Sequence, residues 1–107
     1  MSKAKILIID DEENLRKLLA RIIGLEGFTV LEAGTAKAGF KILESEPLQV
    51  VITDVKLPDA NGVELTAKLK SRFPATEVIV LTAYGTLEDG VYAIKNGAFD
   101  YHTKGDN

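Results

Sequence analysis

Three short stretches of consecutive apolar residues limit the folds that this chain of 107 residues can adopt. They are residues 6–9, 50–52 and 78–81. A strand with one face in water alternates apolar and polar residues, whereas a strand covered on both faces is apolar at every position. The three stretches therefore predict strands of a parallel sheet that is covered on both sides.

Four segments between and after these stretches repeat apolar residues every three or four positions, which is the spacing of one helix face. The repeats are Leu15, Leu18, Leu19 and Ile22 in the first segment, Ala36, Phe40 and Leu43 within residues 35–45, Leu65, Leu69 and Phe73 in the third, and Leu87, Val91 and Ile94 in the fourth. Gly27, Pro47, Pro74 and Gly97 follow these segments and are typical helix-ending residues. The sequence therefore predicts four helices.

Two weaker strand candidates, residues 28–31 and 98–103, complete an alternation of five strands and four helices. This order, with short connections and no linker or repeat, is typical of one α/β domain with parallel strands and right-handed crossovers. We predict a single domain over residues 1–107 with a doubly wound, five-stranded parallel sheet. Ligands of such sheets bind beyond the carboxyl ends of the strands.

Polar residues stand just past four of the five predicted strands. Asp10 and Asp11 follow the first strand, Asp54 the third, Thr82 the fourth and Lys104 the fifth. If the second strand lies at an edge, as in the order 2-1-3-4-5, the other four strand ends are neighbours and these side chains converge. This coincidence is the main functional evidence in the sequence.

Each of these residues has a simpler explanation when it is taken alone. Asp11 can cap the first helix, residues 54–62 (DVKLPDANG) read as a turn, and Thr82 and Lys104 are ordinary residues for a strand end and a surface. Capping and turn formation, however, do not require polar groups at corresponding ends of four strands. We therefore favour a shared site.

Three carboxylates held a few ångströms apart repel one another unless a cation lies between them. With no cysteine and a single histidine, His102, carboxylates are the expected metal ligands. Mg²⁺ is the expected ion because it prefers oxygen ligands and keeps waters that a phosphate can displace.

A carboxylate that attacks a phosphoryl group becomes an acyl phosphate, and Asp54 is the candidate for this step. Mg²⁺ on Asp11, with Asp10 reached through a water, would hold one phosphoryl oxygen, while Lys104 and Thr82 would bind the others. Such transfer depends on positioning and on charge neutralisation.

The charge balance argues against nucleic acid as a direct partner. The chain carries 13 Lys and Arg against 16 Asp and Glu, a formal net charge of −3, and its basic residues are scattered. No run approaches the ~20 apolar residues of a membrane span. We therefore expect a cytoplasmic domain that binds neither DNA nor a membrane.

Taken together, four segments resemble the receiver domains of bacterial two-component response regulators. They are ILIIDDEENLRKLL, VVITDVKLPDANGVEL, VIVLTAYG and GAFDYHTK. The resemblance implies the flavodoxin-like (CheY-like) fold, Mg²⁺ as cofactor and a sensor histidine kinase as phosphoryl donor. It also implies a signalling switch that slowly removes its own phosphoryl group, and not a turnover enzyme.

By this resemblance, Asp54 matches the phosphoacceptor, and Asp10 and Asp11 match the acidic pair of the family. The main-chain carbonyl of Lys56 matches the remaining protein ligand of the magnesium ion. Lys104 matches the lysine that pairs with the phosphoryl group.

The resemblance also implies a conformational switch, in which Thr82 matches the switch hydroxyl and Tyr101 the switch aromatic residue. We further expect Lys56 and Tyr84, each two residues beyond a site residue, to set the rate at which water removes the phosphoryl group.

The segment TAYGTLEDGVYAIKNGAFDY most resembles receivers of the NtrC class, which precede an ATPase domain and a DNA-binding domain in transcription activators. A homodimer is a further expectation. Two features depart from the family: Gly105 replaces the usual proline, so that a cis peptide at 104–105 would cost ~2.5–4 kcal/mol, and no fifth helix follows the last strand.

Three rival functions share parts of this pattern. A magnesium phosphohydrolase of the haloacid-dehalogenase kind needs Asp-x-Asp after its first strand, where this chain has Asp10, Asp11 and Glu12. A flavin-binding module needs a loop rich in Ser, Thr and Gly in place of DDEEN. A degenerate receiver that only binds proteins is the third alternative, and Gly105 keeps it open.

Overall fold

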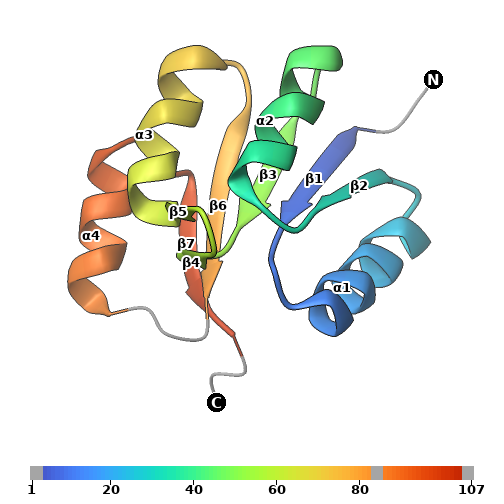
Figure 1. Cartoon of the computed structure of the whole chain (residues 1–107), viewed down its shortest axis with the longest axis horizontal. Helices are drawn as coiled ribbons and strands as arrows, with labels where there is room; N and C mark the ends of the chain where they lie inside the picture. The colour runs from blue at the N-terminus through green and yellow to red at the C-terminus, as the bar shows by residue number, and fades with distance from the viewer. Residues whose placement is uncertain (1–3, 83–85, 105–107) are drawn as a thin grey trace.

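The main sheet has five parallel strands in the predicted order. The computed structural model describes residues 4–82 and 86–104. The strands are β1 (Lys5–Ile9), β2 (Thr29–Ala33), β3 (Val50–Thr53), β6 (Glu77–Thr82) and β7 (Asp100–Thr103). They lie in the order β2-β1-β3-β6-β7, which is 2-1-3-4-5 when these five strands are numbered along the chain (Figure 1). The predicted doubly wound sheet is confirmed.

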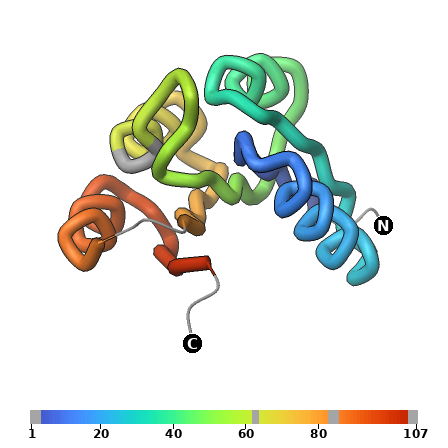
Figure 2. The backbone as a smooth tube through the Cα atoms, turned by 60° about the horizontal axis from the view of Figure 1, so that its bottom comes forward, coloured from blue at the N-terminus to red at the C-terminus, as the bar shows by residue number. Residues whose placement is uncertain are grey.

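Four helices connect the strands in the described part of the chain. They are α1 (Glu13–Leu25), α2 (Ala36–Ser45), α3 (Gly62–Arg72) and α4 (Leu87–Lys95). Helix α1 lies on the opposite side of the sheet from α2 and α3 (Figure 2). The four helices that the sequence predicts are therefore confirmed within the described residues.

The core lies between the central strands and helices α2 and α3. Leu7, Val51 and Val78 are each 0% exposed and belong to one cluster with side chains of both helices. Gly39 in α2 lets this helix approach β1 closely, because a Cβ at that position would lie 2.6 Å from Ile9 Cδ1. Burial on both faces explains why β1 reads as a continuous apolar run, whereas in β3 and β6 buried residues alternate with half-buried ones.

Helix α1 buries less of its apolar face than the sequence predicts. Leu18 and Ile22 remain 53% and 52% exposed, and Leu25 at the end of the helix is 77% exposed. The reason is position: α1 covers β1 and β2, and no other described helix lies on this side of the sheet (Figure 2).

A small hairpin follows β3 and was not predicted. Strands β4 (Lys56–Leu57) and β5 (Ala60–Asn61) pair antiparallel within the segment that reads as a turn in the sequence. Strand β2 continues past its apolar stretch to Ala33, because its register with β1 continues to Ile9. Within residues 4–82 and 86–104, none of the helices has the length and the apolar character that crossing a membrane requires.

Candidate functional site

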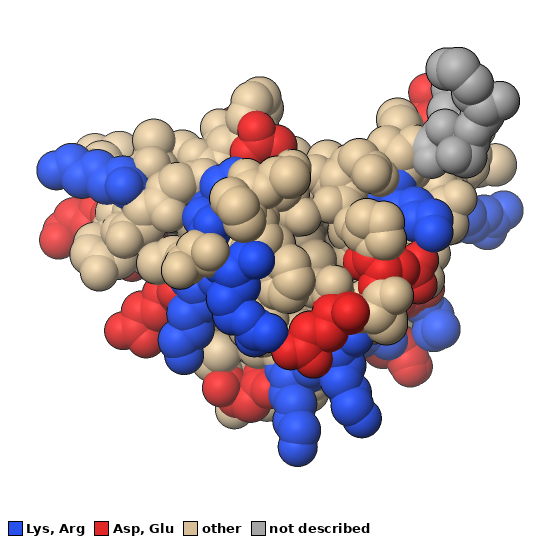
Figure 3. Space-filling view, turned by 90° about the horizontal axis from the view of Figure 1, so that it is seen from above, with Lys and Arg blue, Asp and Glu red and all other residues tan. Residues whose placement is uncertain are grey.

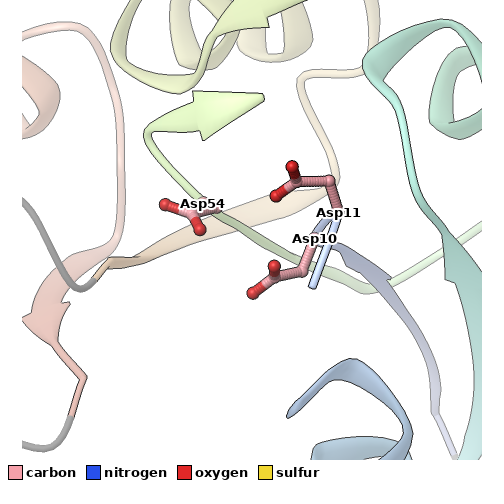
Figure 4. A group of neighbouring side chains, drawn as sticks. All are labelled: Asp10, Asp11 and Asp54. Carbon is pink, nitrogen blue, oxygen red and sulfur yellow. The ribbon is translucent and has the colours of Figure 1, made fainter. Parts of the chain in front are cut away.

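Three carboxylates meet at the carboxyl ends of β1 and β3. Asp10, Asp11 and Asp54 each place one oxygen within 4.8 Å of the others (Figure 4). The parallel register pairs Ile9 with Thr53, so the next residue of each strand enters the same site. Asp10 and Asp54 are buried, 3% and 7% exposed, whereas Asp11 is exposed. The predicted acidic cluster is therefore formed.

The ammonium group of Lys104 bridges two of these carboxylates. Its Nζ lies 2.6 Å from Asp10 Oδ2 and 2.9 Å from Asp54 Oδ2, and the lysine side chain is only 11% exposed. Strand β7 holds it there, since the Lys104 N–H donates to the Thr82 carbonyl at 2.7 Å. Burial alone would lower the pKa of Lys104, but the bonds to Asp10 and Asp54 outweigh it and raise that pKa.

Thr82 ends β6 with its side chain fully buried, at 0% exposure. It lies beside the β3 end because Thr53 pairs with Val80, two residues earlier in β6. The strand-end placement predicted for Thr82 is thus confirmed, and its side chain is buried at this end of the sheet.

Tyr101 points into the molecule. Its ring packs against a cluster of Val55, Val80, Ala93 and Ala98, and its hydroxyl oxygen is buried. Burial raises the pKa of Tyr101, and the nearby negative charge of Asp89 raises that pKa further. The aromatic ring therefore connects β7 with helix α4.

Gly90 of α4 provides the space for the Tyr101 ring. A Cβ at Gly90 would lie 3.0 Å from Tyr101 Cδ1, whereas a Cβ at Gly24 of α1 would meet nothing within 4 Å. Alanine is favoured over glycine in a helix by about 1 kcal/mol. We expect Gly24→Ala to raise the free energy of unfolding by up to that amount, and Gly90→Ala to raise it less or to lower it.

The same pair of variants tests the position of Tyr101. In a background with Tyr84→Phe and Tyr92→Phe, phenolate absorbance reports Tyr101 alone. Gly90→Ala should move the ring toward water and bring its pKa back toward 10.0, and Gly24→Ala should leave it raised. Equal stabilisation by both variants, with unchanged titration curves, would contradict the packing of Tyr101 on Gly90.

Of the remaining predicted residues, the structure describes Lys56 but not Tyr84 or Gly105. Lys56 is exposed and its main-chain N–H donates to Asp54 Oδ1 at 3.2 Å. Tyr84 and Gly105 lie outside the described residues, so the rate-setting role of Tyr84 and the 104–105 peptide stay predictions. The simpler explanation of Asp11 as a helix cap is not seen, because Glu12 occupies the cap position of α1.

Arg16 supports the site and was missed by the sequence analysis. Its Nη1 donates to the main-chain carbonyl of Asp10 at 2.9 Å, and its Nε pairs with Glu32 at 3.0 Å. The guanidinium therefore joins helix α1, strand β2 and the turn that carries the acidic pair. Because Glu32 is sixteen residues away in the chain, spacing along a helix does not reveal this contact.

The donor set fits a hard divalent cation. Carboxylate oxygens are the ligands that Mg²⁺ prefers, and three of them converge here from two strands. Asp10 Oδ1 and Asp54 Oδ1 also accept main-chain N–H groups of Glu12 and Lys56, which fix how both carboxylates are turned. Such outer contacts are typical of metal sites.

Comparison with known proteins identifies the family. The family model named 'Response regulator receiver domain' matches residues 6–106 of this chain. The chain is 39% identical over 104 residues to the response regulator protein PilR of Pseudomonas aeruginosa, covering 97% of this chain and 23% of that protein. It is 35% identical over 101 residues to the transcriptional regulatory protein GlrR of Escherichia coli, covering 94% of this chain and 23% of that protein. The chain thus spans about a quarter of the length of these relatives, both NtrC-class activators.

Solved structures agree with this result. A CheY-like receiver domain protein from Methanospirillum hungatei has a TM-score of 0.93 at 35% identity, covering 99% of this chain and 85% of that one. The beryllofluoride-activated NtrC4 receiver domain dimer has a TM-score of 0.90 at 32% identity, covering 96% and 85%. A Burkholderia pseudomallei response regulator with a phosphorylated aspartic acid, calcium ion and citrate has a TM-score of 0.90 at 30% identity. The match covers 98% of this chain and 62% of that one. The chain therefore belongs to the response regulator receiver domain family of two-component systems.

Proposed function

We propose that this receiver domain is a switch that accepts a phosphoryl group from a sensor histidine kinase on Asp54. The main support for this proposal is the environment of Asp54 at the end of β3. Its buried carboxylate lies beside two other carboxylates and contacts the Lys104 ammonium. Its oxygen would attack phosphorus while the bond from phosphorus to the donor breaks. The product is an acyl phosphate on Asp54.

Asp10, Asp11 and Asp54, with the main-chain carbonyl of Lys56, would hold Mg²⁺. When bound, the ion neutralises phosphoryl oxygens and the repulsion among the carboxylates. The calcium ion and phosphorylated aspartic acid named for the Burkholderia pseudomallei neighbour support a divalent-cation site of this kind.

The protein's own groups would complete the binding of the phosphoryl group. The Lys104 ammonium already contacts Asp54 Oδ2 at 2.9 Å and would pair with a phosphoryl oxygen. The Thr82 hydroxyl would move to donate to another. This movement would change the space beside Tyr101 and hence the equilibrium between conformers of α4 and β7.

The surface of α4 and β7 supports an output through protein contacts. A groove of about 590 Å³ is lined by Leu87, Val91, Ile94 and Tyr101, and Leu87 is 85% exposed. We propose that this surface changes on phosphorylation and transmits the signal to a homodimer partner or to ATPase and DNA-binding domains. The dimer named for the NtrC4 neighbour supports this proposal.

Direct binding of nucleic acid is not part of the proposal. On the face shown in Figure 3, acidic and basic side chains are intermixed and form no single basic patch. The domain would act in the cytoplasm as a switch and not as a turnover enzyme, with Lys56 and Tyr84 setting the rate of dephosphorylation.

Labelling with a small phosphoryl donor tests the proposal. With acetyl phosphate and Mg²⁺, the protein should gain one acid-labile phosphoryl group, seen as a mass increase on the intact protein. The gain should disappear when EDTA removes the metal. Labelling that is equally fast without a divalent cation would contradict the proposed role of the acidic cluster, and steady hydrolysis of phosphomonoesters would favour a phosphohydrolase.

A further inference from the structure

The tip of the β4–β5 hairpin is tied to the start of helix α2. Asp59 Oδ1 accepts the main-chain N–H of Ala36 at 2.9 Å, and Asp59 Oδ2 accepts that of Lys37 at 3.0 Å. These are the first two residues of α2 and lie 22 and 23 residues from Asp59. One carboxylate from a distant segment therefore caps the helix with both oxygens.

Thr35 completes this cap from within the helix segment. Its side chain accepts the N–H of Ala38 at 3.1 Å, and its carbonyl accepts that of Gly39 at 3.1 Å. The first N–H groups of a helix have no partner inside it and favour negative charge. The two N–H groups of Lys37 and Ala36 lower the pKa of Asp59, so its carboxylate stays ionised to a lower pH than that of an ordinary aspartate.

The base of the same hairpin touches the candidate phosphorylation site. Lys56 pairs with Asn61 in the hairpin, and its N–H donates to Asp54 Oδ1 at 3.2 Å. Figure 4 shows β4 beginning directly beyond Asp54. A hairpin with two residues in each strand is marginal by itself, so its position depends on what holds its two ends.

We propose that Asp59 is a positioning residue for the phosphorylation site. Its carboxylate holds the hairpin against α2 and thereby fixes the main chain of residues 55 and 56 beside Asp54. The carbonyl of Lys56, proposed above as a metal ligand, belongs to this main chain. The inference rests on the proposed function for the role of the metal, but the tie itself is a contact within the described residues.

Two cap variants separate the hairpin tie from the stability of α2. Asp59→Ala and Thr35→Ala each remove a cap of the same helix, but only Asp59→Ala releases the hairpin. Amide hydrogen exchange without metal should show faster exchange of the Lys56 N–H in Asp59→Ala and an unchanged rate in Thr35→Ala. Asp59→Asn keeps one acceptor oxygen and should give an intermediate rate.

The second measurement is the affinity for Mg²⁺, determined by calorimetric titration. The salt concentration is about 0.15 M, at which interactions between exposed charges are largely screened. Asp59→Ala should raise the Kd for Mg²⁺ about three- to tenfold, less than the ~10–100-fold loss for a direct outer contact of a metal site, because Asp59 acts through the main chain of the hairpin. Thr35→Ala should change it less than about twofold. Glu64→Gln, which removes an exposed charge from α3, should also leave it nearly unchanged and so controls for net charge.

Circular dichroism confirms that each variant is folded at the temperature used, and Asp59→Asn carries the test if Asp59→Ala is unfolded. The inference would be overturned if Asp59→Ala and Thr35→Ala changed the exchange rate of the Lys56 N–H and the Kd for Mg²⁺ equally, or if neither variant changed them. If the wild-type protein binds no Mg²⁺, the proposed function fails instead, while the exchange of the Lys56 N–H still decides whether Asp59 holds the hairpin.

Discussion

Asp54→Asn should abolish the uptake of acid-labile phosphate from acetyl phosphate. The amide has the size of the carboxylate but lacks the nucleophilic charged oxygen, so no acyl phosphate can form. The variant should remain folded, with a free energy of unfolding within about 1 kcal/mol of wild type, because the amide oxygen can still accept a hydrogen bond. Intact-protein mass spectrometry after incubation with donor and Mg²⁺ measures the result.

The matched control for this variant is Asp100→Asn. Asp100 is a half-exposed carboxylate on β7 that pairs with His102 and lies outside the acidic cluster. The Asp100→Asn variant should take up acid-labile phosphate from acetyl phosphate like wild type. Full labelling of Asp54→Asn, or loss of labelling in both variants, would contradict the assignment of Asp54 as the phosphoacceptor.

Lys104→Met should destabilise the metal-free protein strongly. The substitution keeps most of the side-chain bulk but leaves Asp10 and Asp54 without their ammonium partner, next to the third carboxylate of Asp11. Removing one partner of a buried ion pair costs ~3–5 kcal/mol, and we expect roughly 2–3 kcal/mol here because Lys104 keeps some exposure. Thermal unfolding without metal should show a midpoint about 10 °C below wild type.

Magnesium and pH give this variant a distinct signature. Saturating Mg²⁺ should stabilise Lys104→Met more than wild type, since the ion then compensates the charges of Asp10 and Asp54 that Lys104 no longer neutralises. The raised pKa of Lys104 means that its contribution is complete below the ordinary value of 10.5 and is lost as the pH rises through the folded value. The difference between wild type and variant should therefore shrink at strongly alkaline pH.

Lys17→Met is the control because Lys17 is an exposed lysine on α1. It should unfold at the wild-type temperature with and without metal, within the small effect of a surface substitution. If Lys104→Met and Lys17→Met unfold alike, the bridge between Lys104 and the carboxylates does not stabilise the site.

The sequence predicts the sheet and the site well because both depend on local patterns. Strand β1 is buried on both faces, and β3 and β6 are buried on one face and half-buried on the other, so each carries a continuous apolar run. Asp10, Asp54 and Lys104 follow strand ends directly, and parallel register then brings them together. Once the spatial order 2-1-3-4-5 is assumed, the strand ends are therefore sufficient to predict that these side chains meet.

The supporting contacts were not predictable because they join segments that are distant in the chain. Asp59 caps a helix that begins 23 residues earlier, and Arg16 pairs with Glu32 on a neighbouring strand. The β4–β5 hairpin has only two residues in each strand, too few to show a pattern. The exposure of Leu18 in α1 depends on which helices lie on that face of the sheet, which helix periodicity does not reveal.

The most direct test of the account is a magnesium titration followed by nuclear magnetic resonance of the side-chain carboxyl carbons. The account predicts that the resonances of Asp10, Asp11 and Asp54 shift together and saturate with one bound ion, while the resonance of Asp100 does not move. If Mg²⁺ leaves the three site resonances unchanged, or moves them no more than that of Asp100, the acidic cluster is not a metal site and the proposed phosphoryl transfer loses its basis.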